Sequence, residues 1–144
     1  MRKYLLILVF ALSSVSCSGG NTYRICLPNN HFIVYVTPTI KTVSILDETY
    51  GPDGYIRLLR GDIKVYQVVD NYLVGYLSLE HTAADDLGDF LGKNDKEGYF
   101  VIDLSSNLVN SGLSFLDASK EASDLNFRFP QDFREVNIKD ACSW

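Results

Sequence analysis

The amino-acid sequence predicts an α+β fold, mainly an antiparallel β-sheet with one or two short helices. From Thr22 onward, apolar and polar residues mostly alternate, which is the period of a strand with one buried face. Two β-rich runs, 62–69 and 72–80, flank Asp70-Asn71, and both of these residues tolerate the left-handed backbone of a tight turn. Only two segments follow helical spacing, so we expect strands to outnumber helices.

The first strands are predicted from their β-branched and aromatic content. Residues 23–27 alternate and form the first, a turn follows at 27–30, and 31–36 form the second. Residues 40–46 form the third, and the glycines and proline of 50–54 indicate a loop. The alternation in the third strand puts four side chains on one face: Ile40, Thr42, Ser44 and Leu46.

After the hairpin, residues 99–104 predict a further apolar strand, and 127–138 an additional edge strand. The better helix candidate is 114–125, because Ser114 can cap it and Asp117 follows three residues later. Its expected buried face carries Phe115, Ala118, Ala122 and Leu125. The other candidate, 82–91, is short, acidic and interrupted by a glycine.

The N-terminus has the pattern of an export signal, which we expect to be residues 1–16. Arg2 and Lys3 precede an apolar run over 4–12, which is too short to cross about 30 Å of hydrocarbon as a helix. Ser14-Val15-Ser16-Cys17 resembles a lipobox, with Ser14 where leucine is usual, so Cys17 is the expected lipidation site. Cleavage after Ser16 by an ordinary signal peptidase is the alternative.

Residues 17–21 would then form the lipid anchor and a flexible tether, and 22–144 a single globular domain. Ser18 after the cysteine resembles the sorting signal for the outer membrane. We therefore expect a protein on the periplasmic face of the bacterial outer membrane, touching the membrane only through its anchor. With Cys17 lipidated, Cys26 and Cys142 remain, and an oxidising compartment favours a disulfide between them over two separate thiols.

Charge and motifs argue against several functions. The net charge is −5, and it becomes −7 once the signal and its two basic residues are removed, which disfavours a nucleic-acid partner. The sequence has two histidines and no G-x-S-x-G motif, so we expect no enzyme activity and no cofactor. His81, Asp85 and Asp89 would share a helix face as metal ligands, but acidic residues on a solvated face explain the spacing better.

The segment 80–103 concentrates acidic residues, with seven carboxylates against two lysines. It is either a solvated connection or a docking surface that attracts a basic partner. In the second case Asp85, Asp86 and Asp89 are the expected rim charges. Phe90 and Tyr99 are the expected apolar anchors, although each is also a candidate for the core.

Several short patterns together carry a family resemblance: the lipobox-like signal, Tyr23-Arg24-Ile25, Val68-Val69-Asp70-Asn71-Tyr72, and the run from Gly98 to Asp103 before a helix. With them the chain resembles small bacterial periplasmic immunity lipoproteins. The resemblance implies a protein that binds a cognate secreted toxic effector and inhibits it by occlusion. The alternative is a ligand-binding or envelope-assembly lipoprotein, whose sheet would hold a lipid or an apolar peptide.

Overall fold

The computed structural model describes residues 23–38, 40–47, 49, 54–80 and 92–142. They form an antiparallel sheet whose main strands follow one another as a meander, with one α-helix. The predicted α+β class with mainly antiparallel strands is therefore confirmed. The strands are β1 (Tyr23–Cys26), β2 (His31–Thr37), β3 (Ile40–Leu46), β4 (Tyr55–Val69), β5 (Tyr72–Ser78), β6 (Gly98–Asp103), β7 (Leu108–Leu113) and β8 (Arg134–Glu135). The helices are α1 (Phe115–Asp124) and the short 3-10 helix Ile138–Asp140.

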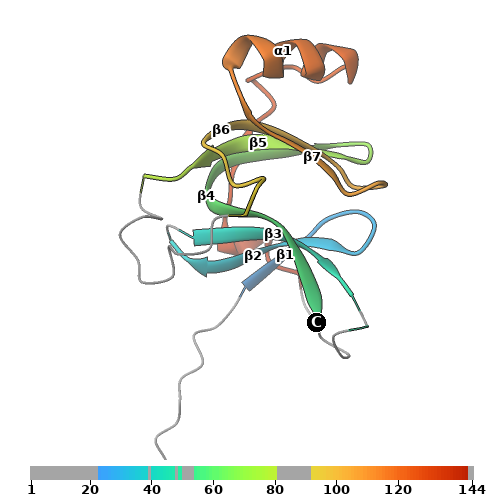
Figure 1. Ribbon diagram of the computed structural model, residues 1–144, viewed down its shortest axis with the longest axis vertical. Helices are drawn as coiled ribbons and strands as arrows, with labels where there is room; N and C mark the ends of the chain where they lie inside the picture. Colours follow the sequence, from blue (N-terminus) through green and yellow to red (C-terminus); the bar gives the residue numbers. More distant parts are fainter. Residues whose placement is uncertain (1–22, 39, 48, 50–53, 81–91, 143–144) are drawn as a thin grey trace, which may run out of the picture.

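Strand β4 is long enough to belong to two layers. Its first half pairs with β3, which gives a first sheet of β1 to β4, and its second half pairs with β5, which gives a second sheet of β4 to β7. Gly61 lies between the two halves with a φ of 155°, and a Cβ there would lie 2.7 Å from the Leu77 side chain. A glycine is thus needed where the strand passes from one sheet to the other. Figure 1 shows the two layers.

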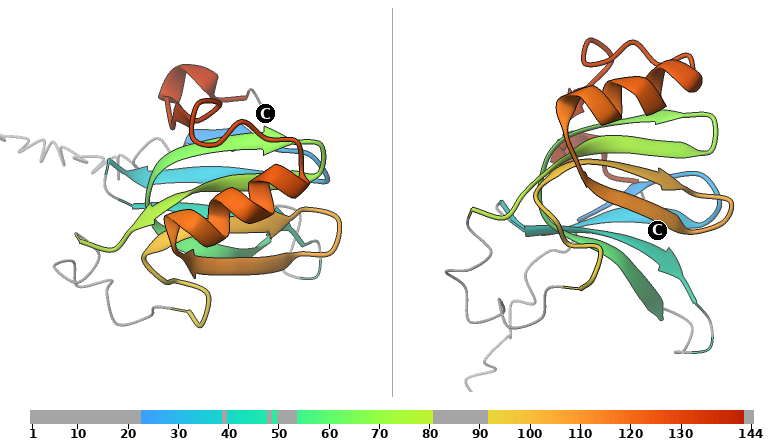
Figure 2. Two further views of the ribbon diagram at one scale, coloured as in Figure 1. Left: turned by 90° about the horizontal axis from the view of Figure 1, so that it is seen from above. Right: turned by 45° about the horizontal axis from the view of Figure 1, so that its top comes forward.

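The main core fills the space between the two sheets. Ile33, Val43 and Leu59 from the first sheet and Tyr66 and Phe100 from the second have no exposed surface. A second apolar cluster lies on the other face of the second sheet, where α1 packs on β6 and β7 (Figure 2). Because both faces of the second sheet are covered, β5 and β6 are apolar at consecutive positions rather than at alternate ones.

Gly75 has little space for a side chain. It pairs with Tyr66 on one side and Phe100 on the other, and a Cβ would lie 2.5 Å from both Phe100 Cζ and the Val65 carbonyl oxygen. We therefore expect Gly75→Ala to lower the free energy of unfolding by about 1–3 kcal/mol, as overpacking does. Urea denaturation would measure this effect. An unchanged urea midpoint would show that the backbone around Gly75 shifts enough to accommodate the added methyl group.

Three turns meet at one end of the molecule and join the two sheets. Leu104 N–H, in the β6–β7 turn, donates to the carbonyl of Asn71 at 2.7 Å, and Asn29 in the β1–β2 turn donates to the Leu104 carbonyl at 3.3 Å. The buried His31 ring lies between the Pro28 carbonyl at 3.1 Å and Asn107 Oδ1 at 2.7 Å. These contacts hold the β1–β2 turn against the β6–β7 turn.

Element boundaries differ from the prediction in three places. β4 begins at Tyr55 rather than at residue 62, β7 was not expected, and only Arg134–Glu135 of the expected edge 127–138 is a strand. β7 was missed because the consecutive residues Asn110, Ser111 and Gly112 interrupt its apolar positions, and Gly112 has a φ of 70°. β3 also differs, since Lys41 and Val43 are buried together with Ile40, Thr42 and Ser44. The expected helix 82–91 lies outside the described residues.

Helix α1 begins as predicted. The Ser114 hydroxyl accepts a hydrogen bond from Asp117 N–H at 3.2 Å and donates to the Asp117 carboxylate at 2.6 Å, so one residue satisfies a free amide of the first turn. Ala118 and Ala122 are fully buried against the sheet. Phe115 was expected on that buried face, but it is the first residue of α1 and is 54% exposed, although its ring still contacts Phe129.

Candidate protein-binding surface

A disulfide joins the two ends of the described domain. Cys26 at the end of β1 is bonded to Cys142, with their Cα atoms 5.7 Å apart, and this confirms the predicted pair. Cys142 N–H also donates to the Arg24 carbonyl at 2.9 Å. The C-terminal segment is thereby held along the first sheet. The predicted lipidation site, Cys17, lies outside the described residues.

A buried charge cluster lies where β3 and β4 pair near Gly61. Lys41 Nζ donates to Asp62 Oδ1 at 2.6 Å and to the Pro38 carbonyl at 2.7 Å, and Lys64 contacts the other Asp62 oxygen at 2.5 Å. Burial favours a neutral Asp62, but the hydrogen bonds and charges of the two lysines outweigh it and hold the pKa of Asp62 below its ordinary value. Lys41 and Asp62 are both buried and bonded to each other, so the role of this pair is structural.

The acidic segment 80–103 divides into described and undescribed parts. Asp85, Asp86, Asp89 and Phe90 lie outside the described residues. Three other carboxylates accept hydrogen bonds from the chain itself. Asp95 is buried and accepts from Arg60 N–H at 2.7 Å and from Gly92 N–H at 2.5 Å.

Glu97 accepts a hydrogen bond from Leu79 N–H at 3.0 Å, and Asp103 accepts from Ser105 and Ser106 in the β6–β7 turn. The bonds from these two serines lower the pKa of Asp103. Asp95, Glu97 and Asp103 thus stabilise loops, which the sequence pattern of seven acids did not reveal.

Tyr99 belongs to a cluster of rings on the α1 side of the second sheet. Its ring centroid is 5.0 Å from those of Tyr76 and Phe129 and 6.0 Å from that of Phe115. Tyr99 itself is half-buried, so part of it belongs to the core, and its role as an anchor for a partner stays a prediction. We call this group the aromatic cluster; it comprises Tyr76, Tyr99, Phe115, Phe127, Phe129 and Phe133.

The outer side of the aromatic cluster is exposed at the start of α1. Phe115 is 54% exposed although its ring contacts Phe129, with a centroid distance of 4.8 Å, and the next residue, Leu116, is 77% exposed. Two large apolar side chains in adjacent positions are costly to leave in water and mark a candidate interaction surface. Helical spacing alone did not identify them, because it places Phe115 with the buried alanines.

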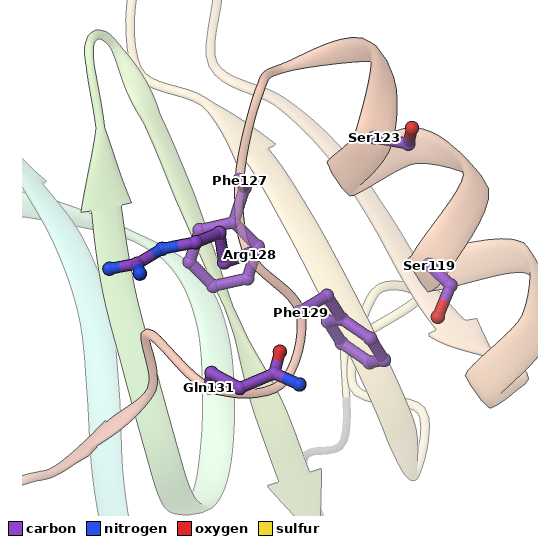
Figure 3. A pocket seen from close by; sticks show the side chains of 6 residues that line it. All are labelled: Ser119, Ser123, Phe127, Arg128, Phe129 and Gln131. Carbon is purple, nitrogen blue, oxygen red and sulfur yellow. The ribbon is translucent and has the colours of Figure 1, made fainter.

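A groove runs beside this surface, between α1 and the loop that follows it. It has a volume of about 530 Å³ and is lined by Ser119, Ser123, Phe127, Arg128, Phe129 and Gln131. Figure 3 shows the two serines on the helix and the other four residues on the loop. We call this the α1 groove. Its base is aromatic and its rim is polar.

A second hollow of about 350 Å³ lies on the outer face of the first sheet, lined by Ile40, Thr42, Tyr55, Arg57 and Arg60. Its two arginines already have interaction partners within the chain, including Asp95, which lies 3.8 Å from Arg57 Nη2. This hollow is therefore a weaker candidate than the α1 groove.

Two further observations concern the described residues alone. They contain no group of three or more His, Cys, Asp or Glu side chains arranged to hold a metal ion, and the His81, Asp85 and Asp89 set lies outside them. No helix among them is long and apolar enough to cross a membrane. Comparison with protein-family models, with curated proteins and with solved structures gave no match.

Proposed function

We propose that this protein is a periplasmic immunity protein, anchored in the outer membrane through Cys17, that binds a cognate secreted toxic effector and inhibits it by occlusion. It performs no chemistry of its own. The observation that carries the proposal is the exposed apolar surface at Phe115 and Leu116, which lies on a disulfide-bonded β-scaffold. The export-type N-terminus and the family resemblance support the compartment and the kind of partner.

The exposed surface has the properties of a protein-binding site. Aromatic side chains provide a large part of the binding energy at protein interfaces. The ring of Phe115 is held by Tyr99 and Phe129, so little conformational freedom is lost when a partner covers it. A ligand carrier would instead need a sizeable apolar cavity. The space between the sheets is filled by side chains such as Tyr66 and Phe100, which favours the inhibitor over the carrier.

The function is tested with any secreted effector that a gene neighbouring this one encodes. We expect the wild-type protein to protect susceptible cells and to bind the purified effector with a dissociation constant in the nanomolar range or tighter, about −12 kcal/mol or better. Protection assays and binding kinetics measure this. Failure to bind any neighbouring effector would refute the proposal and favour the carrier.

The rim charges predicted from the sequence have their own test. We expect Asp85→Lys, Asp86→Lys and Asp89→Lys together to slow association with the effector and to weaken its salt dependence, because these carboxylates would steer a basic partner. Dissociation should change less. Kinetics at two salt concentrations measure both effects, and unchanged association would place the steering charges elsewhere on the domain.

Lipidation of Cys17 is expected from the Val15-Ser16-Cys17 junction and the flexible residues that follow it. Cells labelled with a palmitate analogue should show label on the wild type in the membrane fraction. Cys17→Ser should carry no label and stay soluble. Equal, minimal labelling of both proteins would exclude the anchor.

A further inference from the structure

We propose that the outer edge of β7 binds an extended, positively charged segment of a partner protein, which pairs with β7 as a further strand of the second sheet. The inference deepens the proposed function and rests on it insofar as the partner is the toxic effector. It adds the backbone conformation and the charge of the segment that binds. β7 ends at Leu113 and α1 begins at Phe115, so the edge adjoins the exposed pair Phe115 and Leu116 along the chain.

The other outer edges of the two sheets each meet another part of the chain. At β1, Cys142 N–H donates to the Arg24 carbonyl, and in the first half of β4 the Arg60 amide donates to the Asp95 carboxylate. The second half of β4 pairs with β8. Contacts of this kind occupy the backbone groups of a strand edge, so that fewer of them remain to pair with another chain.

β7 lacks such a cover in the part of the chain that the structure describes. It is the last strand of the second sheet, and among the described residues it pairs with β6 alone (Figure 2). Its sequence has no charged residue and no proline, which are residues that commonly keep an exposed edge from pairing. All six residues are exposed or partly exposed, and Leu108 is 70% exposed. An open edge presents unpaired N–H and C=O groups, so it recognises an extended backbone.

The first half of β7 is the most open part of this edge. Near the other end of the strand, Ser111 Oγ donates to the Asn94 carbonyl at 2.6 Å. The Lys96 side chain also lies close to Gly112, 3.0 Å from where a Cβ on that glycine would be. The loop before β6 therefore contacts the second half of β7, and a partner strand would pair mainly with residues 108–110.

Carboxylates of α1 determine the charge beside this edge. Glu121 Oε1 accepts a hydrogen bond from Asn110 Nδ2 at 2.6 Å, which places a carboxylate next to the middle of β7. Asp117 lies four residues earlier on the same side of the helix and is bonded to Ser114, just after the strand. Both carboxylates accept hydrogen bonds from uncharged groups, and neither has an ion-pair partner among the described residues.

Two lysines of the same region are placed differently. Lys120 lies about 100° round the helix from Glu121, and it shares its row with Asp124, four residues later. Lys96 lies at the end of β7, beside Gly112. Glu121 is thus the charge next to the open part of the edge, and it complements a lysine or arginine on a partner strand. Because side chains alternate along a strand, such cations would occupy every second position of the segment.

The first test uses the mature, disulfide-bonded protein and the peptide acetyl-Val-Lys-Val-Lys-Val-amide, whose lysines share one face when it is extended. Nuclear magnetic resonance titration should shift the amide signals of β7 in a saturable way and slow hydrogen exchange there. The matched peptide with glutamate in place of both lysines should bind about fivefold more weakly, because its charge is reversed. Absent shifts, shifts centred on β1 or β8, or equal or tighter binding of the glutamate peptide would overturn the proposal.

N-methylated peptides test strand pairing itself. Successive N–H groups of a strand point to opposite sides, so one alternate set would face β7 and the other would face away. One peptide is N-methylated on both lysines, and the other on the second and third valines. We expect one of the two to lose saturable binding and the other to bind about as well as the unmodified peptide. Equal effects of the two modifications would show that the peptide does not bind as a strand.

Glu121→Lys tests the charge beside the edge. It should weaken binding of the lysine peptide about two- to fivefold and strengthen binding of the glutamate peptide by a similar factor. The matched control is Glu135→Lys, at an exposed position of β8 on the opposite edge of the second sheet. It changes the net charge equally and should leave both affinities unchanged. Well-dispersed spectra of each variant establish folding, and equal effects of the two variants would refute the site.

Competition with a neighbouring effector separates this inference from the proposed function. If the wild type binds the effector, and neither saturating lysine peptide nor Glu121→Lys weakens that binding, the interface lies elsewhere and the inference is wrong, while the immunity function stands. If no effector binds but the lysine peptide pairs with β7, the immunity function is wrong and the edge serves another basic partner. Displacement of the effector by the lysine peptide, together with weaker effector binding by Glu121→Lys, supports both.

Discussion

Asp62→Ala is expected to lower the free energy of unfolding by about 3–5 kcal/mol, because it leaves a buried cation without its partner. The Lys41 and Asp62 side chains are only 8% and 4% exposed, and their charged atoms are 2.6 Å apart. Without the Asp62 carboxylate, the Lys41 ammonium group keeps its hydrogen bond to the Pro38 carbonyl. Urea denaturation of wild type and variant measures the difference.

Lys64→Ala is the matched control, since Lys64 contacts the same carboxylate but is 47% exposed. Its loss should cost at most about 1 kcal/mol, as for surface ion pairs. Replacing both buried partners, with Lys41→Met and Asp62→Leu, should recover much of the lost stability. Equal effects of Asp62→Ala and Lys64→Ala would show that burial of the pair contributes little.

The same pair predicts a dependence of stability on pH. The pKa of Asp62 is lowered in the folded state, so its contribution is fully present above the unfolded value of about 3.9 and is lost as pH falls through the folded value. The stability gap between wild type and Asp62→Ala should therefore be constant at neutral pH and shrink below about pH 4. Urea midpoints at several pH values test this, and a gap that widens in acid would contradict the assignment.

Loss of the Cys26–Cys142 disulfide is the second change with a large expected effect. The bridge spans 116 residues of sequence, and the chain-entropy model gives about 4–5 kcal/mol as an upper figure for such a loop. Cys26→Ser with Cys142→Ser, or reduction of the wild type, should therefore shift the urea midpoint strongly. Intact-mass analysis after alkylation is the control, and two alkylated thiols in protein that has not been reduced would refute the bridge.

Local signals in the sequence were sufficient for much of the fold. The turn at Asp70-Asn71 predicted the β4–β5 hairpin, and Asp70 has the positive φ that such a turn demands, 52°. Ser114 with Asp117 predicted the start of α1. Counting cysteines predicted the disulfide, because one thiol was assigned to the anchor and only one pair remained.

Features that depend on neighbouring strands could not be predicted in this way. β7 carries Asn110, Ser111 and Gly112 in its second half, and it forms because it pairs with β6. The buried charge pair joins positions 21 residues apart, and neither residue is unusual in its local sequence. The α1 groove depends on the path of the loop that follows α1. The periodicity of apolar residues predicts helices and strands, and it does not predict the path of a loop.

The Cys26–Cys142 disulfide also determines how the domain responds to mechanical tension. Tension applied between Tyr23 and Cys142 passes through the few residues of β1 and then directly across the bond from Cys26. The chain between the two cysteines, which holds β2 to β7, α1 and the α1 groove, carries none of this load. A pull on the two ends could therefore extend the oxidised molecule by only a few residues, whereas the reduced molecule would unravel through its whole length. Tension between the two ends of the oxidised domain would therefore leave α1 and the groove beside it folded.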